Sequence, residues 1–310
     1  MARTLFNNID FMALRKPAML FSCALILISI ISLITLKLNV GIDFTGGSIV
    51  EIGYQQAVEL EPIRQALEVE GFGDAIVQHF GSASEVLIRL VPDADKDKAE
   101  LSSDIIGLLQ NISETPIDVR RVDFVGPQVG EELTEDGGLA VLYALIAILI
   151  YVAFRFEYRF SLGAVAALIH DVIITLGIFS ILQLDFDLSV LASILAVIGY
   201  SLNDTIVVFD RVRENFRKIR KRTSLEVINT SINQTISRTL MTSFTTLLVL
   251  LSLFFLGGEV IHSFALALII GVLVGTYSSI YVATTSALAL GISRSDLLLP
   301  DKEGEEMARP

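Results

Sequence analysis

Asp204 is the residue that most strongly suggests chemistry, because it stands inside an apolar run from Leu188 to Phe209. Its local sequence is Ser201-Leu202-Asn203-Asp204-Thr205. A carboxyl group at the centre of a membrane helix costs about 2.5–3.5 kcal/mol unless a partner or water offsets it. An ionisable residue kept there indicates a function, and proton handling is the function typical of such carboxyl groups.

A cationic residue, Arg238, precedes the fifth apolar run. The fourth run is expected to cross from outside to inside and the fifth to return, so Asp204 and Arg238 are both predicted in the cytoplasmic third of the membrane. Desolvation favours the neutral form of a carboxyl group, whereas a nearby guanidinium favours the ionised form. Arginine itself stays charged, so its movement could change the protonation of Asp204. The same pair could equally be a static salt bridge between two helices.

Two further polar sites fall within apolar runs. His170 and Asp171 are adjacent near the middle of the third run, and Asn203 precedes Asp204 in the fourth. Neighbouring residues on a helix point about 100° apart, so His170 and Asp171 are not expected to share one partner directly. Each could bind a neighbouring helix or buried water. A proton-relay role is left open for Asp171 and, with less support, for His170, and Asn203 is a further candidate for proton transport.

The elements that must position these residues are membrane helices. The chain is 53% hydrophobic with a mean hydropathy of +0.65, too apolar for a soluble protein of 310 residues. Each apolar run can cross roughly 30 Å of hydrocarbon at about 1.5 Å per residue. The expected segments are a cytoplasmic N-terminus at 1–17, transmembrane helices at 18–36, 137–154, 160–182, 188–209, 239–258 and 264–290, a basic cytoplasmic loop at 210–238, and a cytoplasmic tail at 291–310.

Charge sets the predicted orientation. Basic residues precede the first run, separate the second from the third, and crowd the loop at 210–238, where they are also expected to touch anionic lipid headgroups. These segments share one side, which is therefore cytoplasmic, together with both termini. The net charge of −12 comes largely from the long loop at 37–136 on the opposite, periplasmic side and argues against a nucleic-acid partner.

The loop at 37–136 is long enough to form a domain. Alternating and helical patterns predict strands at 48–54, 75–80, 86–91 and 117–125, and helices ending at Gly71 and spanning 95–112. The order β-α-β-β-α-β is that of a ferredoxin-like α+β domain. The predicted fold class is therefore a helical protein with six transmembrane helices and a periplasmic ferredoxin-like domain between the first two.

Glycine-rich segments join this domain to the membrane. The entry carries Asp43, Gly46 and Gly47, and the exit carries Gly126 and Pro127. Glycine permits backbone conformations closed to other residues, so both segments are candidate hinges. They could equally be tight turns at a crowded junction.

Several motifs resemble the SecF branch of the SecD/SecF family of bacterial protein-export membrane proteins, within the resistance-nodulation-division superfamily. The resemblance extends over nearly the whole chain. It is carried by Gly41-Ile42-Asp43-Phe44-Thr45-Gly46-Gly47, Val125-Gly126-Pro127, His170-Asp171-Val172, Val197-Ile198-Gly199-Tyr200-Ser201-Leu202-Asn203-Asp204-Thr205-Ile206-Val207-Val208-Phe209-Asp210-Arg211, Arg238-Thr239-Leu240 and Tyr277-Ser278-Ser279-Ile280-Tyr281-Val282-Ala283.

The resemblance implies a subunit that works with SecD and the SecYEG translocon in the inner membrane, with YajC and YidC as further candidate partners. It implies that the proton-motive force drives late export of the preprotein, and that Asp204 and Arg238 take part in proton transport. No cofactor and no metal are expected. Because the chain begins just before its first span, we expect SecD to be a separate polypeptide.

Other functions are weaker expectations. Asp171 and Asp204 could supply the two carboxyl groups of an intramembrane aspartyl protease, but they lack the glycine-flanked pattern of those enzymes. Ser201 and His170 could form a serine nucleophile and base. A third alternative is an assembly factor that transports nothing. Transport driven by ATP is disfavoured because the chain has no G-x-x-x-x-G-K-[ST] phosphate loop, and no enzyme activity is expected.

Overall fold

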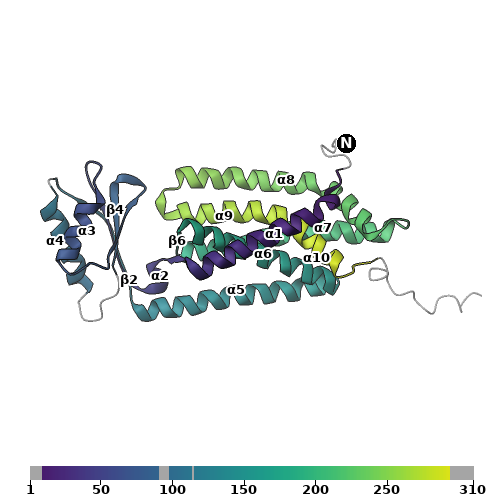
Figure 1. The fold of residues 1–310 in the computed structure, drawn as a ribbon, viewed down its shortest axis with the longest axis horizontal. Coiled ribbons are helices and arrows are strands. Elements are labelled where there is room, and N and C mark those ends of the chain that lie inside the picture. Colours follow the sequence, from purple (N-terminus) through teal and green to yellow (C-terminus); the bar gives the residue numbers. More distant parts are fainter. Residues whose placement is uncertain (1–8, 91–97, 114, 294–310) are drawn as a thin grey trace, which may run out of the picture.

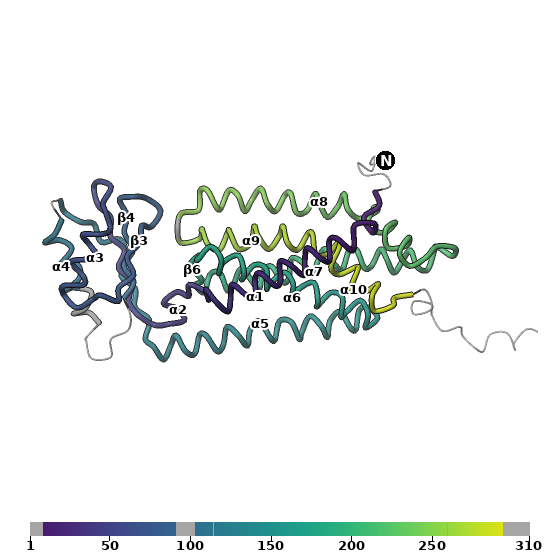
Figure 2. Tube along the Cα trace, in the orientation of Figure 1, coloured from purple at the N-terminus to yellow at the C-terminus, as the bar shows by residue number. Residues whose placement is uncertain are grey.

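The computed structural model describes residues 9–90, 98–113 and 115–293. Residues 1–8 of the expected N-terminal segment and 294–310 of the expected tail lie outside the described residues, as does the start of the helix expected at 95–112. Figure 1 shows an elongated molecule with a small sheet domain at one end of a bundle of long helices. The tube in Figure 2 shows that the helices run mainly along the long axis.

Six helices in the described part are long and apolar enough to cross a membrane, as predicted. The first is α1 (Arg15–Thr35), which follows a short 3-10 turn, η1 (Phe11–Leu14). The sixth comprises α9, a π-helical turn η2 and α10. The bounds of the rest of the bundle are α5 (Pro127–Arg155), α6 (Tyr158–Leu182), α7 (Leu188–Lys218), α8 (Ser224–Leu256), α9 (Glu259–Ser278), η2 (Ser279–Ala283) and α10 (Thr284–Ala289).

Several helices extend beyond the apolar runs that mark them in the sequence. The segment 210–238 is helical except at residues 219–223, because α7 continues to Lys218 and α8 begins at Ser224. A capping box starts α8: Thr223 accepts from the backbone of Glu226, and Glu226 accepts from that of Thr223. Arg238 is therefore held within a continuous helix.

Small residues let the bundle helices approach closely. A β-carbon added at Gly271 of α9 would lie 2.1 Å from Val197 of α7, and one at Gly177 of α6 would lie 2.2 Å from Ser29 of α1. Tight packing of this kind is how membrane helices associate without a hydrophobic driving force between them. It places α6, α7 and α9 around the polar residues predicted from the sequence.

The sheet domain has the predicted element order. It consists of β2 (Gly47–Gly53), α3 (Leu60–Val69), β3 (Ile76–Phe80), β4 (Ser82–Leu90), α4 (Lys98–Ile112) and β5 (Asp118–Val125). The strands pair antiparallel in the order β3-β4-β2-β5. Side chains from β2, β3 and β4 pack with Ile63 and Leu67 of α3 and Ile105 and Leu109 of α4 in a core separate from that of the bundle. Both helices lie on the side of the sheet away from the bundle (Figure 1).

The domain meets the bundle through short elements that the sequence patterns did not predict. A two-residue strand β1 (Asn39–Val40) pairs in parallel with β6 (Asp185–Phe186), which lies between α6 and α7. One helical turn, α2 (Ile42–Thr45), then leads into β2. The domain is thus joined to the α6–α7 connection as well as to α1 and α5.

Candidate functional site

Asp204 lies on α7 with only 3% of its surface exposed. Its Oδ2 atom has no hydrogen-bond partner among the described residues, and the same holds for the buried hydroxyls of Thr205 and Thr239. Ser243 on α8 is close enough to interact with the carboxyl group. Buried polar atoms are usually hydrogen-bonded, so unpartnered atoms in a native fold call for an explanation such as bound water or a functional role.

Arg238 lies level with Asp204 on the neighbouring helix. The Tyr200 hydroxyl is 3.4 Å from Ser243 Oγ, and Asn215 donates to Ser231 Oγ at 2.8 Å, so α7 and α8 run antiparallel with Asp204 beside Thr239. The charge of Arg238 acts on Asp204 through space. However, no salt bridge within 4.0 Å joins them among the described ion pairs, and the Arg238 side chain is exposed. The geometry is an open pair.

Asn203 points away from this buried site. Its side chain is exposed, whereas Ser201, Leu202, Asp204 and Thr205 are buried. The adjacent positions on α7 thus divide between the interior of the bundle and its surface. The structure therefore does not bring Asn203 to Asp204.

His170 and Asp171 lie on α6, are both buried, and contact each other directly. His170 Nδ1 is 2.8 Å from Asp171 Oδ1, and His170 Nε2 is 3.2 Å from Ser22 Oγ of α1. The two side chains share no third partner, as expected, but they bond to each other, which the sequence did not predict, because side-chain rotation closes the angle between the two Cα–Cβ directions. The expected bonds to neighbouring helices also form.

Asp171 gathers hydroxyl donors from two other helices. Ser201 of α7 donates to Asp171 Oδ2 at 2.5 Å, and Ser278 of α9 donates to the same atom at 2.8 Å. The carboxyl group thus links α6, α7 and α9, while His170 links α6 to α1. Gly275 makes room for this approach, because a β-carbon there would lie 3.0 Å from Ser201 Cβ.

The same contacts bear on the two protease hypotheses. Ser201 donates to Asp171, and both ring nitrogens of His170 contact Asp171 and Ser22, so the arrangement is not that of a serine with its histidine base. No hydrogen bond within the described part of the chain joins the carboxyl groups of Asp171 and Asp204. An aspartyl pair sharing one proton is not assembled here.

The serine residues of α1 form helix contacts that the sequence analysis did not predict. Ser22, Ser29 and Ser32 are the buried residues of this helix, and all face α6 or its neighbours. Ser22 also contacts the Tyr277 hydroxyl at 3.1 Å, and Ser32 contacts Ser180 at 2.8 Å. Their helical spacing along an apolar run was the available signal, because small polar residues of membrane helices tend to face other helices.

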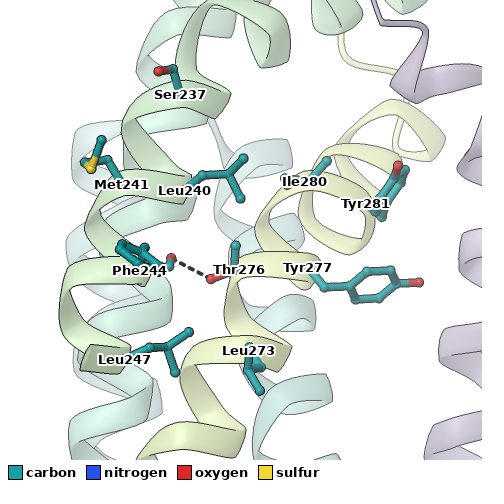
Figure 3. Close-up of a pocket in the computed structure, with 11 residues that line it drawn as sticks. Ser237, Leu240, Met241, Phe244, Leu247, Leu273, Thr276, Tyr277, Ile280 and Tyr281 are labelled. Carbon is teal, nitrogen blue, oxygen red and sulfur yellow. Dashed lines mark hydrogen bonds between the residues drawn. The ribbon is translucent and has the colours of Figure 1, made fainter. Parts of the chain in front are cut away.

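A groove of about 650 Å³ lies between α8 and α9 (Figure 3). Its walls are mainly apolar, and a hydrogen bond of 2.7 Å between Ser243 and Thr276 crosses it. Tyr277 lines one wall, and its ring extends away from α8 (Figure 3). Neither Asp204 nor His170 lines the groove; Tyr277, which contacts Ser22, does.

The predicted hinge residues form a tightly packed junction. Asp43 Oδ2 accepts from the backbone of Leu188, the first residue of α7, at 3.0 Å. Gly46 and Gly47 have φ angles of +71° and +124°, which favour glycine. Gly126 precedes α5 and Pro127 is its first residue, with its Cα only 2.9 Å from a β-carbon added at Gly46. Entry and exit segments therefore lie against each other.

An ion pair that the sequence did not indicate strengthens this junction. Arg89 of β4 donates to Asp185 of β6 at 3.1 Å, and its other terminal nitrogen donates to the Val40 carbonyl at 3.0 Å. Asp185 also accepts from Asn39 at 2.8 Å and from Gln78 at 3.1 Å. One carboxylate thus joins the sheet domain, the end of the first span and the α6–α7 connection.

Comparison with known proteins supports the resemblance. Residues 105–293 match the family "Protein export membrane protein SecD/SecF, C-terminal", and residues 31–58 match the "SecD/SecF GG Motif". A protein translocase subunit SecF of Vibrio alginolyticus is 55% identical over 97% of this chain and 96% of its own length. The SecF of Pseudomonas aeruginosa is 46% identical over 98% of both chains.

Solved structures agree with these relatives. The crystal structure of SecDF, a translocon-associated membrane protein from Thermus thermophilus, matches with a TM-score of 0.84 and 39% identity. The match includes 94% of this chain but only 39% of the Thermus chain, so the chain spans well under half of that protein. The family model, the relatives of nearly equal length and the shared fold agree, and the chain therefore belongs to the SecD/SecF family of protein-export membrane proteins.

Proposed function

We propose that the chain is the SecF subunit of a SecD–SecF complex that uses the proton-motive force to drive late preprotein export across the inner membrane. Relatives named protein translocase subunit SecF, similar over nearly the whole chain, support the subunit identity. The observation that carries the proton-driven mechanism is the buried Asp204 carboxyl group, with an unpartnered oxygen beside the helix that carries Arg238.

In this proposal Asp204 takes up and releases a proton as Arg238 approaches and withdraws. The open pair is the state in which the carboxyl group is shielded from water and not neutralised by a salt bridge, which favours proton uptake. Closing the pair would favour the ionised carboxylate. One elementary charge crossing 100 mV supplies about 2.3 kcal/mol, enough to bias two helix arrangements of similar energy. Asp171 and His170 remain candidates for a relay, and Asn203 for a contact at the surface.

A partner subunit explains the exposed polar residues of the spans. An uncovered guanidinium in the apolar layer is costly, and Arg238 and Asn203 are both exposed in the isolated chain. The Thermus relative is named SecDF, and the part of it outside the match is long enough for a second subunit. We propose that SecD covers Arg238 and Asn203 in the assembled complex.

The wider assembly follows from the family. SecYEG and the translocating preprotein are the proposed partners, with YajC and YidC as further ones, and anionic lipids contact the basic end of α7 and the turn after it. The proposed location is the bacterial inner membrane with both termini cytoplasmic. In Figure 1 the described N-terminal end and the α7–α8 connection lie at the end of the bundle opposite the sheet domain, which supports this orientation.

We assign the sheet domain to the periplasm and to the ferredoxin-like class. Its β-α-β-β-α-β order, its antiparallel sheet in the order β3-β4-β2-β5 and its two helices on one face support the class. The proton gradient is the proposed energy source, with no cofactor, metal or enzymatic step. A protease finds no support in the contacts of Ser201, His170 and Asp171.

The test compares Asp204→Asn with Asp210→Asn in liposomes that contain the chain with its SecD. Asp210 lies on the same helix but is exposed and bonded to Arg155, which makes it a matched control. We expect both variants to assemble with SecD, and proton flux to fall at least about tenfold, ~1.4 kcal/mol, only in Asp204→Asn. Full flux in Asp204→Asn that still responds to an uncoupler would contradict the proposal.

A further inference from the structure

The hydrogen-bonded chain from His170 to α1 and α9 has a fixed direction. The Tyr277 hydroxyl contacts the Ala18 carbonyl at 2.7 Å, and a carbonyl oxygen can only accept. The single hydroxyl hydrogen of Tyr277 is therefore used there. At the 3.1 Å contact with Ser22, Tyr277 must accept and Ser22 must donate.

The same count decides the state of the histidine ring. Ser22 has one hydroxyl hydrogen, which goes to Tyr277, so it can only accept at its 3.2 Å contact with His170 Nε2. His170 Nε2 therefore carries a hydrogen. His170 Nδ1 lies 2.8 Å from Asp171 Oδ1, a contact that also requires a hydrogen. The His170–Asp171 pair thus holds one proton more than a neutral ring beside a carboxylate.

Asp171 is arranged to keep this pair ionic. Its other oxygen accepts from two hydroxyl groups, Ser201 at 2.5 Å and Ser278 at 2.8 Å. Hydrogen bonds to an ionised acceptor are about twice as strong as those between neutral groups. The added proton is therefore assigned to the ring, as an imidazolium that contacts Asp171 on one side and Ser22 on the other.

Release of that proton moves it from His170 Nε2 to a water molecule and needs two hydroxyl rotations. Tyr277 turns from Ala18 to donate to Ser22, Ser22 turns from Tyr277 to donate to the bare Nε2, and His170 becomes a neutral ring that still donates to Asp171. Tyr277 and Ser278 are the last residues of α9 and immediately precede the π turn η2. Such turns are frequent at functional sites and allow local rearrangement of a helix.

We propose that the His170–Asp171 pair is a proton-binding site separate from Asp204, loaded in this conformation, with Ser22 and Tyr277 as the positioning residues that hold its proton. Other ionisable groups on the surrounding helices include Asp204 on α7, Arg238 on α8 and Tyr281 on η2. The α1 neighbour of Ser22 is the exposed Cys23, and the acidic residues early in α5 and its Arg155 are exposed towards its two ends. The role of this site in transport rests on the proposed function, whereas the binding of a proton at the site does not.

The test reads the protonation of the His170 ring by nitrogen NMR in lipid nanodiscs. The chain has three histidines, so replacing His79 and His262 with Gln leaves His170 as the only labelled ring. We expect both ring nitrogens to be protonated at neutral pH. A singly protonated ring in the otherwise native chain would overturn the proposal.

Tyr277→Phe removes the acceptor that uses the Ser22 hydrogen, so Ser22 becomes free to donate to Nε2. We expect the proton affinity of His170 in this variant to fall at least about tenfold, which lowers the midpoint of its titration by about one pH unit. Tyr281→Phe is the matched control, because the centroid of the Tyr281 ring lies 5.3 Å from that of Tyr277 but Tyr281 lies outside the hydrogen-bonded chain. Equal midpoints in the two variants would contradict the assigned direction of the chain.

Ser22→Ala provides a second variant if Tyr277→Phe does not fold. It leaves the Nε2 hydrogen without an acceptor and is expected to lower proton affinity in the same direction; an unchanged midpoint would count against the proposal. None of these readings depends on Asp204. Normal proton flux in Asp204→Asn would overturn the proposed function while leaving the His170 result intact.

Discussion

At the scale of single residues, Arg238 tests whether the open pair is a switch or a static support. It is level with Asp204 but not bonded to it, so removing its charge breaks no salt bridge in this conformation. We expect Arg238→Met to assemble with SecD and to lose proton-driven export at least about tenfold, ~1.4 kcal/mol. Arg238→Lys, which keeps the charge but not the planar fork, should retain part of the activity. Export and proton flux in liposomes measure both.

Ser237→Ala is the neighbouring control, because this residue lines the groove and carries no charge. Normal export in a double variant of Arg238→Met and Asp204→Asn would show that the two residues only balance each other's charge. An unstable complex in Arg238→Met alone would favour the static alternative. The sequence could place both residues at one depth, but only the structure shows that the pair is open, because side-chain direction around α8 is set by packing.

At the scale of elements, the junction between sheet domain and bundle depends on Arg89 and Asp185. The Arg89 side chain is 11% exposed and that of Asp185 is 34% exposed, so the pair is only partly screened by water. Removing one member of a fully buried ion pair lowers stability by about 3–5 kcal/mol. Because Asp185 is partly exposed, we expect Arg89→Leu to destabilise the junction by only about 1–3 kcal/mol. We expect Arg89→Leu to speed hydrogen exchange at amides of β1 and β6 while leaving the sheet core protected.

Arg120→Leu is the control, since its contacts with Glu85 and Asp118 are exposed. The exchanged pair Arg89→Asp with Asp185→Arg should recover part of the protection. Unchanged exchange at β1 and β6 in Arg89→Leu would mean that the parallel strand pairing holds the junction without the ion pair.

The elements also show how far sequence patterns reach. The six apolar helices were predictable from the length of their apolar runs, and the β-α-β-β-α-β order from hydrophobic periodicity, which follows from the face that is buried. The strand pair β1–β6 was not, since it joins two-residue segments about 145 residues apart and has no periodicity to detect. The direct contact of His170 with Asp171 was also missed, because backbone geometry alone does not fix side-chain rotation.

At the scale of the whole molecule, the arrangement predicts that two ends of the bundle lie in different compartments. The sheet domain lies at one end, and residues 219–223 at the other (Figure 1). Basic residues near the second end are expected to stay cytoplasmic, because their transfer across the membrane is disfavoured. Cys23 is exposed on α1 and would be replaced by Ala, so that single cysteines can be introduced elsewhere.

We expect Ser82→Cys, in the sheet domain, to react with a membrane-impermeant maleimide added to intact spheroplasts. A cysteine at Lys221 should react only after the membrane is opened, with labelling at least about tenfold weaker before that step. Both positions are in surface-accessible segments of the described chain, so a difference between them reports sidedness rather than burial. Equal labelling in intact spheroplasts, or the reverse order, would overturn the orientation and would place Asp204 near the periplasmic rather than the cytoplasmic side of the bundle.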